Sequence, residues 1–202
     1  MEITFAEALN QAMFEEMERD EKVFLMGEDV ALSEISPATA GLSERFGTER
    51  VRNTPISELG FTGAAVGAAM AGYRPILDMR RIDFMMLSID QIANQAAKLR
   101  YMLGGQVSIP LVIRAPEGGG VQNGPTHSQC LESWFLQVPG LRVVIPSGPK
   151  DAKGLLKTSI RDDNPVLFVE YRQLYLNKED VQEGDHIIPF SSASIKKEGK
   201  DI

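Results

Sequence analysis

The chain has 202 residues, which is long enough for one domain with a substantial hydrophobic core. Its net charge of −7 argues against nucleic acid as the principal partner, because phosphate binding needs a basic surface. One cysteine, Cys130, excludes an internal disulfide, and no apolar run reaches the roughly 20 residues of a membrane span. Because Met1 leads directly into a helical pattern, we expect a cytoplasmic protein without a signal peptide.

The first quarter of the chain alternates helical and strand patterns. The apolar run at 23–26, closed by Gly27, is typical of a strand that is buried on both faces. Glu28 follows at the carboxyl end of that strand, where open parallel sheets bind ligands. The expected elements are a helix from 5 to about 18–21 behind a capping box, a strand at 23–26, a loop at 31–40, a short helix at 39–46 and a strand at 50–53.

The stretch from 53 to 75 places one acid, Glu58, before a run of small, uncharged residues. Gly63, Gly67 and Ala71 recur every four residues, so a helix here has one face almost without side chains. Each helical glycine costs about 1 kcal/mol relative to alanine, which indicates that this face is used for close packing. Taken alone, the stretch also fits a buried crossover helix with Glu58 as an ordinary acid at its start.

The rest of the chain continues the alternation. The expected elements are strands at 74–79, 110–114, 141–145 and 165–171 and helices at 88–103, 131–138 and 149–161. This order predicts an α/β fold with a mostly parallel sheet and helices on both faces. We expect one domain over residues 1–185, followed by a polar tail, or the start of a further domain, at 186–202.

Two further groups of residues are candidates for chemistry. His127 follows a glycine-rich loop at the expected carboxyl end of the 110–114 strand, although a lone loop histidine is more often structural or merely exposed. The helix ending at Arg161 runs into Asp162 and Asn164, whose oxygens and the last helical carbonyls suit a monovalent cation. An ordinary acidic turn before Pro165 explains that spacing as well.

Several ordered motifs together resemble a known family, the beta subunits of thiamine-diphosphate 2-oxo acid dehydrogenases. The resemblance covers residues 3 to about 200 and implies the pyrimidine-binding, transketolase-like fold. The motifs are G-E-D at 27–29, T-P-I-S-E-L-G-F-T-G-A-A-V-G at 54–67, I-D-Q at 89–91, A-A-K-L-R-Y-M-L-G-G at 96–105, P-T-H-S-Q at 125–129, P-G-L-R-V-V-I-P-S at 139–147 and K-G-L-L-K-T-S-I-R-D-D-N-P-V at 153–166.

The resemblance implies roles for four side chains. Glu58 stands five residues before Gly63 and matches the glutamate that hydrogen-bonds the aminopyrimidine ring of thiamine diphosphate. A carboxyl group in a dry site can favour the imino tautomer of that ring. Phe84 matches the aromatic side chain on the pyrimidine face, His127 matches an active-site histidine, and Glu28 resembles an acid near the cofactor. A structural potassium site is implied at Leu111, Ser159, Ile160, Asp162 and Asn164.

The resemblance also implies partners, because part of the cofactor site is absent. The family's G-D-G…N motif, which holds magnesium and the diphosphate and usually lies on the alpha subunit, does not occur in this sequence. We therefore expect half a cofactor site in a heterotetramer with an alpha subunit and a second beta chain. The implied activity is oxidative decarboxylation of a 2-oxo acid with acyl transfer to the lipoyl group of an acyltransferase core.

Two other interpretations remain open at this point. A non-catalytic assembly module could keep the fold without the activity, and a transketolase-like sugar enzyme could share it with different substrate-binding residues. The chain also departs from the family at Arg80 and Arg81, which stand where apolar or aromatic residues are usual. These cations either favour an anionic substrate or face solvent or a partner subunit.

Overall fold

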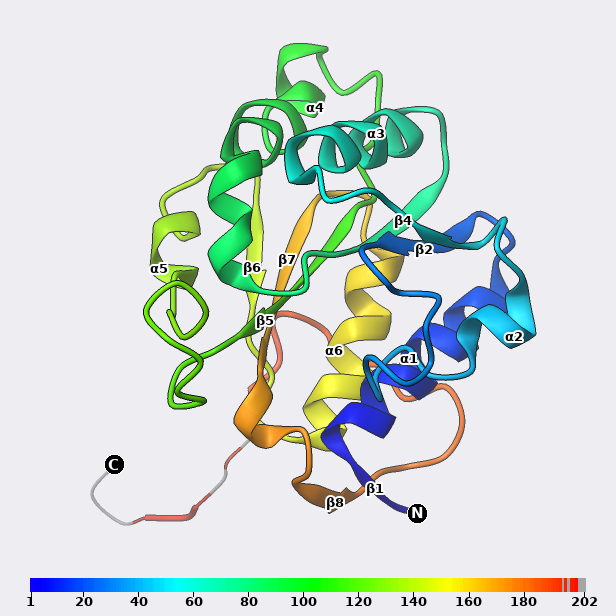
Figure 1. Ribbon diagram of the computed structural model, residues 1–202, viewed down its shortest axis with the longest axis vertical. Coiled ribbons are helices and arrows are strands. Elements are labelled where there is room, and N and C mark those ends of the chain that lie inside the picture. Colours follow the sequence, from blue (N-terminus) through cyan, green and yellow to red (C-terminus); the bar gives the residue numbers. More distant parts are fainter. Residues whose placement is uncertain (194, 196, 200–202) are drawn as a thin grey trace.

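The computed structural model describes residues 1–193, 195 and 197–199, and its centre is a parallel sheet of six strands (Figure 1). The strand order is β3-β2-β4-β5-β7-β6, and every neighbouring pair is parallel. Each strand is short and mostly apolar, as expected for strands covered on both faces. The bounds are β2 Val23–Gly27, β3 Val51–Asn53, β4 Arg74–Asp78, β5 Val112–Glu117, β6 Arg142–Val144 and β7 Val166–Tyr171.

Helices cover both faces of this sheet and enclose two separate hydrophobic cores. On one face, α1 (Phe5–Arg19) and α6 (Pro149–Arg161) pack side by side (Figure 1). On the other lie α3 (Glu58–Met70), the 3-10 helix η1 (Ile82–Ser88), the π-helix η2 (Gln91–Ala96), α4 (Leu99–Met102) and α5 (Glu132–Phe135). The predicted α/β fold with a parallel sheet and helices on both faces is thus confirmed. No helix in the described part of the chain combines the length and apolarity that crossing a bilayer requires.

One predicted helix, at 88–103, is broken into a π-helix and a short α-helix. The break falls at Ala97, whose backbone N–H donates to the carbonyl of Ile92, five residues back. Gly140 lies against this point with φ +94°, and a Cβ there would lie 2.0 Å from the Ala97 carbonyl oxygen. The backbone of a loop distant in sequence therefore occupies the space beside the break. No local sequence pattern predicts such a contact.

Three short elements were not predicted from the sequence. They are the strands β1 (Glu2–Thr4) and β8 (Lys178–Asp180), which pair antiparallel, and the 3-10 helix η3 (Arg172–Leu174). Three residues are too few to show a period, and all of β8 is exposed and charged. The predicted capping box is present, since the Glu7 N–H donates to Thr4 Oγ1 at 3.2 Å. Of the predicted tail at 186–202, residues 194, 196 and 200–202 lie outside the described residues.

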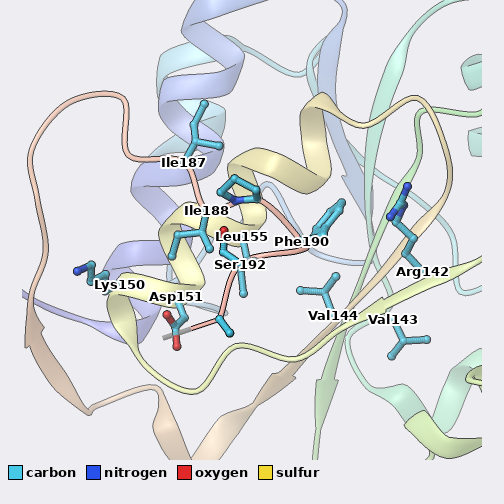
Figure 2. Close-up of a pocket in the computed structure, with 12 residues that line it drawn as sticks. Arg142, Val143, Val144, Lys150, Asp151, Leu155, Ile187, Ile188, Phe190 and Ser192 are labelled. Atoms are coloured by element: carbon cyan, nitrogen blue, oxygen red, sulfur yellow. The ribbon is translucent and has the colours of Figure 1, made fainter. Parts of the chain in front are cut away.

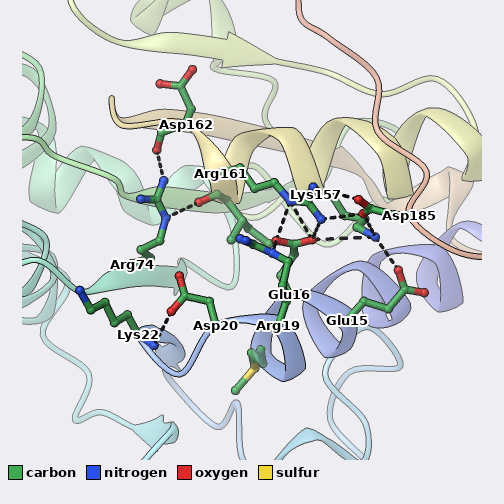
Figure 3. A network of polar contacts seen from close by, with 12 residues as sticks. Glu15, Glu16, Arg19, Asp20, Lys22, Arg74, Lys157, Arg161, Asp162 and Asp185 are labelled. Carbon is green, nitrogen blue, oxygen red and sulfur yellow. Dashed lines mark hydrogen bonds and ion pairs between the residues drawn. The ribbon is translucent and has the colours of Figure 1, made fainter.

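A network of charged groups joins α1 to α6 at the edge of the first core (Figure 3). Glu16 is fully buried, and its carboxylate accepts hydrogen bonds from Arg161 at 2.6 Å and from Arg19 at 2.8 Å. Lys157 reaches Glu15 at 2.7 Å and Asp185 at 2.8 Å. A buried carboxylate is tolerated only with such partners, so the network fixes how the two helices lie against each other.

Candidate functional site

The residues predicted for the cofactor and substrate gather at the carboxyl edge of the sheet, where β2, β4, β5 and β7 end. They are Glu28, Glu58, Phe84 and His127. A cavity of about 310 Å³ opens at this edge. Parallel strands bring their carboxyl ends to one edge, so the loops that follow them converge on this cavity. Its lining residues are Glu28, Ile35, Ser36, Pro37, Asp78, Arg80, Arg81, Phe84, Pro116, His127, Arg172 and Tyr175.

A fully buried arginine, Arg114 of β5, joins the strands behind this cavity. Its guanidinium donates to Glu170 of β7 at 2.6 and 2.9 Å and to Asp78 of β4 at 2.9 Å. The Tyr175 hydroxyl also donates to Glu170, at 2.6 Å, and Asp78 accepts the backbone N–H of Arg80. Burial opposes the charge of Arg114, but the two carboxylates outweigh it and raise the pKa of Arg114. The network fixes β4, β5 and β7 relative to one another behind the cavity.

Two of the predicted acids, Glu28 and Glu58, lie close enough to interact. Glu58 is the first residue of α3 and is only 6% exposed, and Glu28 is half-buried in the cavity wall. Burial raises the pKa of Glu28, and the negative charge of Glu58 raises it further. Glu58 itself is not among the residues that line the cavity. The two carboxyl groups therefore lie together at the wall of the cavity.

Phe84 and His127 meet across the cavity. Their rings lie 5.3 Å apart at 89°, an edge-to-face arrangement. The imidazole Nδ1 is 3.0 Å from the Thr126 hydroxyl, and Arg81 donates to the His127 carbonyl at 3.3 Å. A Cβ at Gly118 would lie 2.1 Å from that same carbonyl oxygen, so glycine lets the loop pack closely against the end of β5.

Three arginines give the cavity a positive wall. Arg80, Arg81 and Arg172 all line it, and none of them forms a salt bridge within the part of the chain that the structure describes. Arg80 adopts the left-handed backbone conformation, with φ +58°, beside Asp78. Burial lowers the pKa of Arg81, and the neighbouring charge of Arg172 lowers it further. Guanidinium groups that lack a salt bridge in one cavity suit an anionic ligand.

The residues implied in potassium binding surround the end of α6. Arg74 enters this group, donating to the carbonyl of Ile160 at 2.8 Å and to that of Asp162 at 2.7 Å (Figure 3). Arg100 donates to the side-chain oxygen of Asn164 at 2.8 Å. One oxygen from each of Ile160, Asp162 and Asn164 thus accepts a hydrogen bond from an arginine of the chain. The set Leu111, Ser159, Ile160, Asp162 and Asn164 stays a prediction.

A larger cavity, of about 700 Å³, contains no predicted site residue. It lies between the β6 edge of the sheet and the segment that follows β8, with Val144, Leu155 and Phe190 in its wall (Figure 2). The charged residues in its lining are Arg142, Lys150 and Asp151, and most of the others are apolar. The smaller cavity at the carboxyl edge therefore remains the candidate site.

Comparison with known families decides which family this is. Residues 1–178 match the family described as the transketolase, pyrimidine binding domain. The chain belongs to this pyrimidine-binding family. In a pyrimidine-binding domain the carboxyl edge of the sheet is the expected ligand side, and that is where the candidate site lies.

Relatives of this pyrimidine-binding domain include several dehydrogenase beta subunits, as the sequence motifs indicated. The 2-oxoisovalerate dehydrogenase subunit beta of Bacillus subtilis is 48% identical over 99% of this chain and 62% of its own length. The pyruvate dehydrogenase E1 component subunit beta of Rickettsia bellii is 49% identical over 100% of this chain and 62% of its own length. The mitochondrial pyruvate dehydrogenase E1 component subunit beta of Bos taurus is 45% identical over 100% of this chain and 58% of its own length. The chain thus spans about three fifths of the length of these relatives.

A solved structure supports the fold alone. The chain described as "Split gene transketolase, inactive beta4 tetramer" superposes with a TM-score of 0.76 at 22% identity, covering 98% of this chain and 60% of that one. The predicted resemblance to 2-oxo acid dehydrogenase beta subunits is confirmed by the sequence comparisons, and the predicted transketolase-like fold is confirmed by the structural one.

Sequence patterns missed the charged groups that the strands bring together. Arg114 interrupts an apolar run, and a charge in a buried strand requires a partner. Asp78 is the last residue of β4 and Glu170 the next-to-last of β7, the strands on either side of β5, and these two acids were the available signal. Arg172 begins the short 3-10 helix η3 and Tyr175 follows it, where no sequence pattern points to the cavity.

Proposed function

We propose that this chain is the pyrimidine-binding part of the beta chain of a thiamine-diphosphate-dependent 2-oxo acid dehydrogenase. One observation carries the proposal: Glu58, buried at the start of α3, interacts with Glu28 at the wall of the cavity that holds the Phe84–His127 pair. A dry carboxyl group, an aromatic ring and an imidazole are the groups that a ring cofactor and a 2-oxo acid require there. The names of the relatives support the same activity.

Each of these side chains has a part in the proposal. Thiamine diphosphate, when bound, supplies the electron sink for decarboxylation. Glu58 would hold a proton between its carboxyl oxygen and a ring nitrogen of the pyrimidine, and its burial would strengthen that interaction. Phe84 would pack against the ring, Glu28 would border it, and His127 would orient the substrate for transfer of its acyl group to a lipoyl group. Edge-to-face packing on Phe84 restricts the imidazole to few orientations.

The proposed enzyme needs other chains. An alpha subunit would supply the magnesium and diphosphate site, a second beta chain would complete the heterotetramer, and a lipoyl-bearing acyltransferase would accept the acyl group. The outer surface of α3 and of the residues just before it supports a subunit contact. Gly67 and Leu59 of α3 face open space and solvent, Leu59 being 51% exposed, and Ile56 before the helix is 81% exposed. A cytoplasmic location is part of the same proposal.

The three arginines that lack a salt bridge define the proposed substrate class. A 2-oxo acid carries one carboxylate at its reacting end. Arg80, Arg81 and Arg172 share the cavity with Glu28 and Asp78. Because Asp78 already pairs with Arg114, Glu28 alone offsets their charge, and more positive charge remains than one substrate carboxylate neutralises. We infer that the substrate bears a second anionic group. Its hydrogen bonds to guanidinium would each contribute about 1.5–3 kcal/mol.

Glu58 is tested in the assembled enzyme. Glu58→Gln keeps the shape of the side chain but removes its acid–base capacity, so turnover of the assembled alpha/beta enzyme should fall by at least about 100-fold. Steady-state kinetics measure this loss, and gel filtration checks that assembly persists. Glu183→Gln, an exposed control, should retain full turnover. Near-normal turnover of the assembled Glu58 variant would instead favour a non-catalytic module.

Substrate class is tested by comparing two acids on one variant. Arg172→Gln should raise KM about tenfold for a dicarboxylic 2-oxo acid and leave KM for a branched monocarboxylic one unchanged. Arg52→Gln, exposed and outside the cavity, is the control. An equal effect on both acids would remove the second anionic group from the proposal.

A further inference from the structure

A second group of reactive side chains lies at the base of the loop that carries His127. Glu117 is the last residue of β5, Cys130 follows the loop, and Glu132 begins α5. One ligand atom from each lies within 4.8 Å of the others. Glu117 is 1% exposed, Glu132 is half-buried, and Cys130 is open to solvent. The proposed decarboxylation uses none of the three.

The carboxylate of Glu117 has no cationic partner to balance it among the described residues. Tyr171, Cys130 and Glu132 lie close to it, but none of them forms a hydrogen bond of good geometry with either of its oxygens, and Glu132 Oε2 is likewise buried without such a partner. Among the residues described, no lysine or arginine forms an ion pair with either acid. Tyr171 donates to Glu132 Oε1 at 3.4 Å, a long and therefore weak hydrogen bond. Unpaired buried carboxylates are costly, so this group must hold a positive charge, either a proton or a cation.

Burial and charge at this site both favour uptake of a positive species. Glu117 is buried, the ligand atoms of Cys130 and Glu132 lie beside it, and no lysine or arginine among the described residues pairs with either acid. Two carboxylates and a thiolate together carry three negative charges, which a divalent cation balances better than a monovalent one.

The donor atoms select the class of cation. One sulfur and two carboxylate oxygens match zinc and related divalent transition ions, which accept thiolate and carboxylate together. Calcium and magnesium take oxygen ligands, so the sulfur of Cys130 argues against them. Three protein ligands leave a fourth tetrahedral position open, and the exposure of Cys130 provides a path for entry.

We propose that Glu117, Cys130 and Glu132 bind one divalent ion of the zinc class, which fastens the base of the His127 loop. The ion would join the end of β5 to the start of α5, closing residues 118–129 between its ligands. A Cβ at Gly119 would lie 2.5 Å from the Cys130 sulfur, so the thiol already packs against this loop. The site rests on its own ligands and does not depend on the proposed dehydrogenase activity.

Cobalt and zinc titrations of the full chain test the site without any mutation. After treatment with a chelator, the protein should take up one equivalent of Co²⁺ and develop a thiolate-to-metal charge-transfer band in its absorption spectrum. One equivalent of Zn²⁺ should then remove the band by displacing the cobalt. Absence of the band at saturating Co²⁺ overturns the proposal and leaves a shared proton between Glu117 and Glu132.

Three variants locate the ion. Cys130→Ser, Glu117→Gln and Glu132→Gln should each weaken zinc binding at least about tenfold, measured by competition with a chromogenic chelator. The exposed control Glu183→Gln should bind as the unchanged protein does. Circular dichroism confirms that each variant is folded. One-to-one binding that survives all three changes places the metal elsewhere and overturns the proposal.

Discussion

At the scale of single residues, Arg114 sets the shape of the candidate site without lining it. It connects Asp78 of β4 to Glu170 of β7 across the strand between them. Asp78 in turn accepts the backbone N–H of Arg80, which holds that residue in its left-handed conformation at the cavity wall. A single buried guanidinium thus links the core to the positions of the groups that would meet substrate.

Removing this guanidinium should be costly. Arg114→Met leaves Asp78 and Glu170 buried without a counter-charge, so the free energy of unfolding should fall by about 3–5 kcal/mol. Urea denaturation measures this loss in the free energy of unfolding. The control, Arg45→Met, breaks an exposed pair with Glu18 and should cost no more than about 1 kcal/mol. Equal losses in the two variants would contradict the role given to Arg114.

At the scale of elements, α3 buries Ala65 and Ala69 in the second core, whereas other small residues along it face outward. A Cβ at Gly67 would meet no atom within 4 Å, and Gly60, Ala64 and Ala71, which follows the helix, are exposed. A helix that bears the cost of a glycine at an exposed position is suited to close contact with another chain there. Glu58 at its start and the bare face along its length would then place the cofactor site near a subunit boundary.

Two glycine substitutions separate packing within the chain from packing between chains. Gly67→Ala should leave the lone chain folded, with a gain in stability of up to about 1 kcal/mol, yet weaken its co-purification with an alpha subunit. Gly140→Ala should destabilise the lone chain, because its Cβ would collide with the Ala97 carbonyl oxygen and its φ is +94°. Thermal unfolding distinguishes them, and loss of stability in Gly67→Ala would refute the first expectation.

How far the sequence predicts such elements depends on the range of the interactions that form them. The helix at 149–161 has the predicted bounds, because Pro149 at its first turn and Pro165 beyond its end are local signals. The break near Ala97 depends on Gly140, more than 40 residues away, and could not be read from the pattern. Likewise, Glu58 and His127 belong to recognisable motifs, whereas Arg172 reaches the cavity only through the folded strand order.

At the scale of the whole molecule, one sheet edge carries every group assigned to the site. The face formed by α1 and α6 is fixed by buried charges around Glu16 and contributes stability, not chemistry. The carboxyl edge holds the acids, the aromatic pair and the three arginines, but the G-D-G…N motif for the diphosphate is absent from the sequence. This division is what the proposal of a shared cofactor site requires.

A shared site predicts weak binding by the lone chain. Titration calorimetry with thiamine diphosphate and Mg²⁺ should detect little or no heat for this chain by itself, and clear binding after an alpha subunit is added. The Glu58→Gln variant with the alpha subunit serves as the matched control and should bind less tightly. Tight magnesium-dependent binding by the lone chain would show that it carries a complete site.

The left-handed backbone at Arg80 has a consequence for directed evolution. A bulky residue at φ +58° costs roughly 1–2 kcal/mol that glycine would not incur. Selection for heat resistance alone should therefore enrich Arg80→Gly and discard a guanidinium from the cavity wall. Selection for turnover of a doubly charged acid should retain Arg80. The two selections thus favour different residues at position 80. Sequencing the survivors of each selection would show whether Arg80 is retained for binding the doubly charged acid.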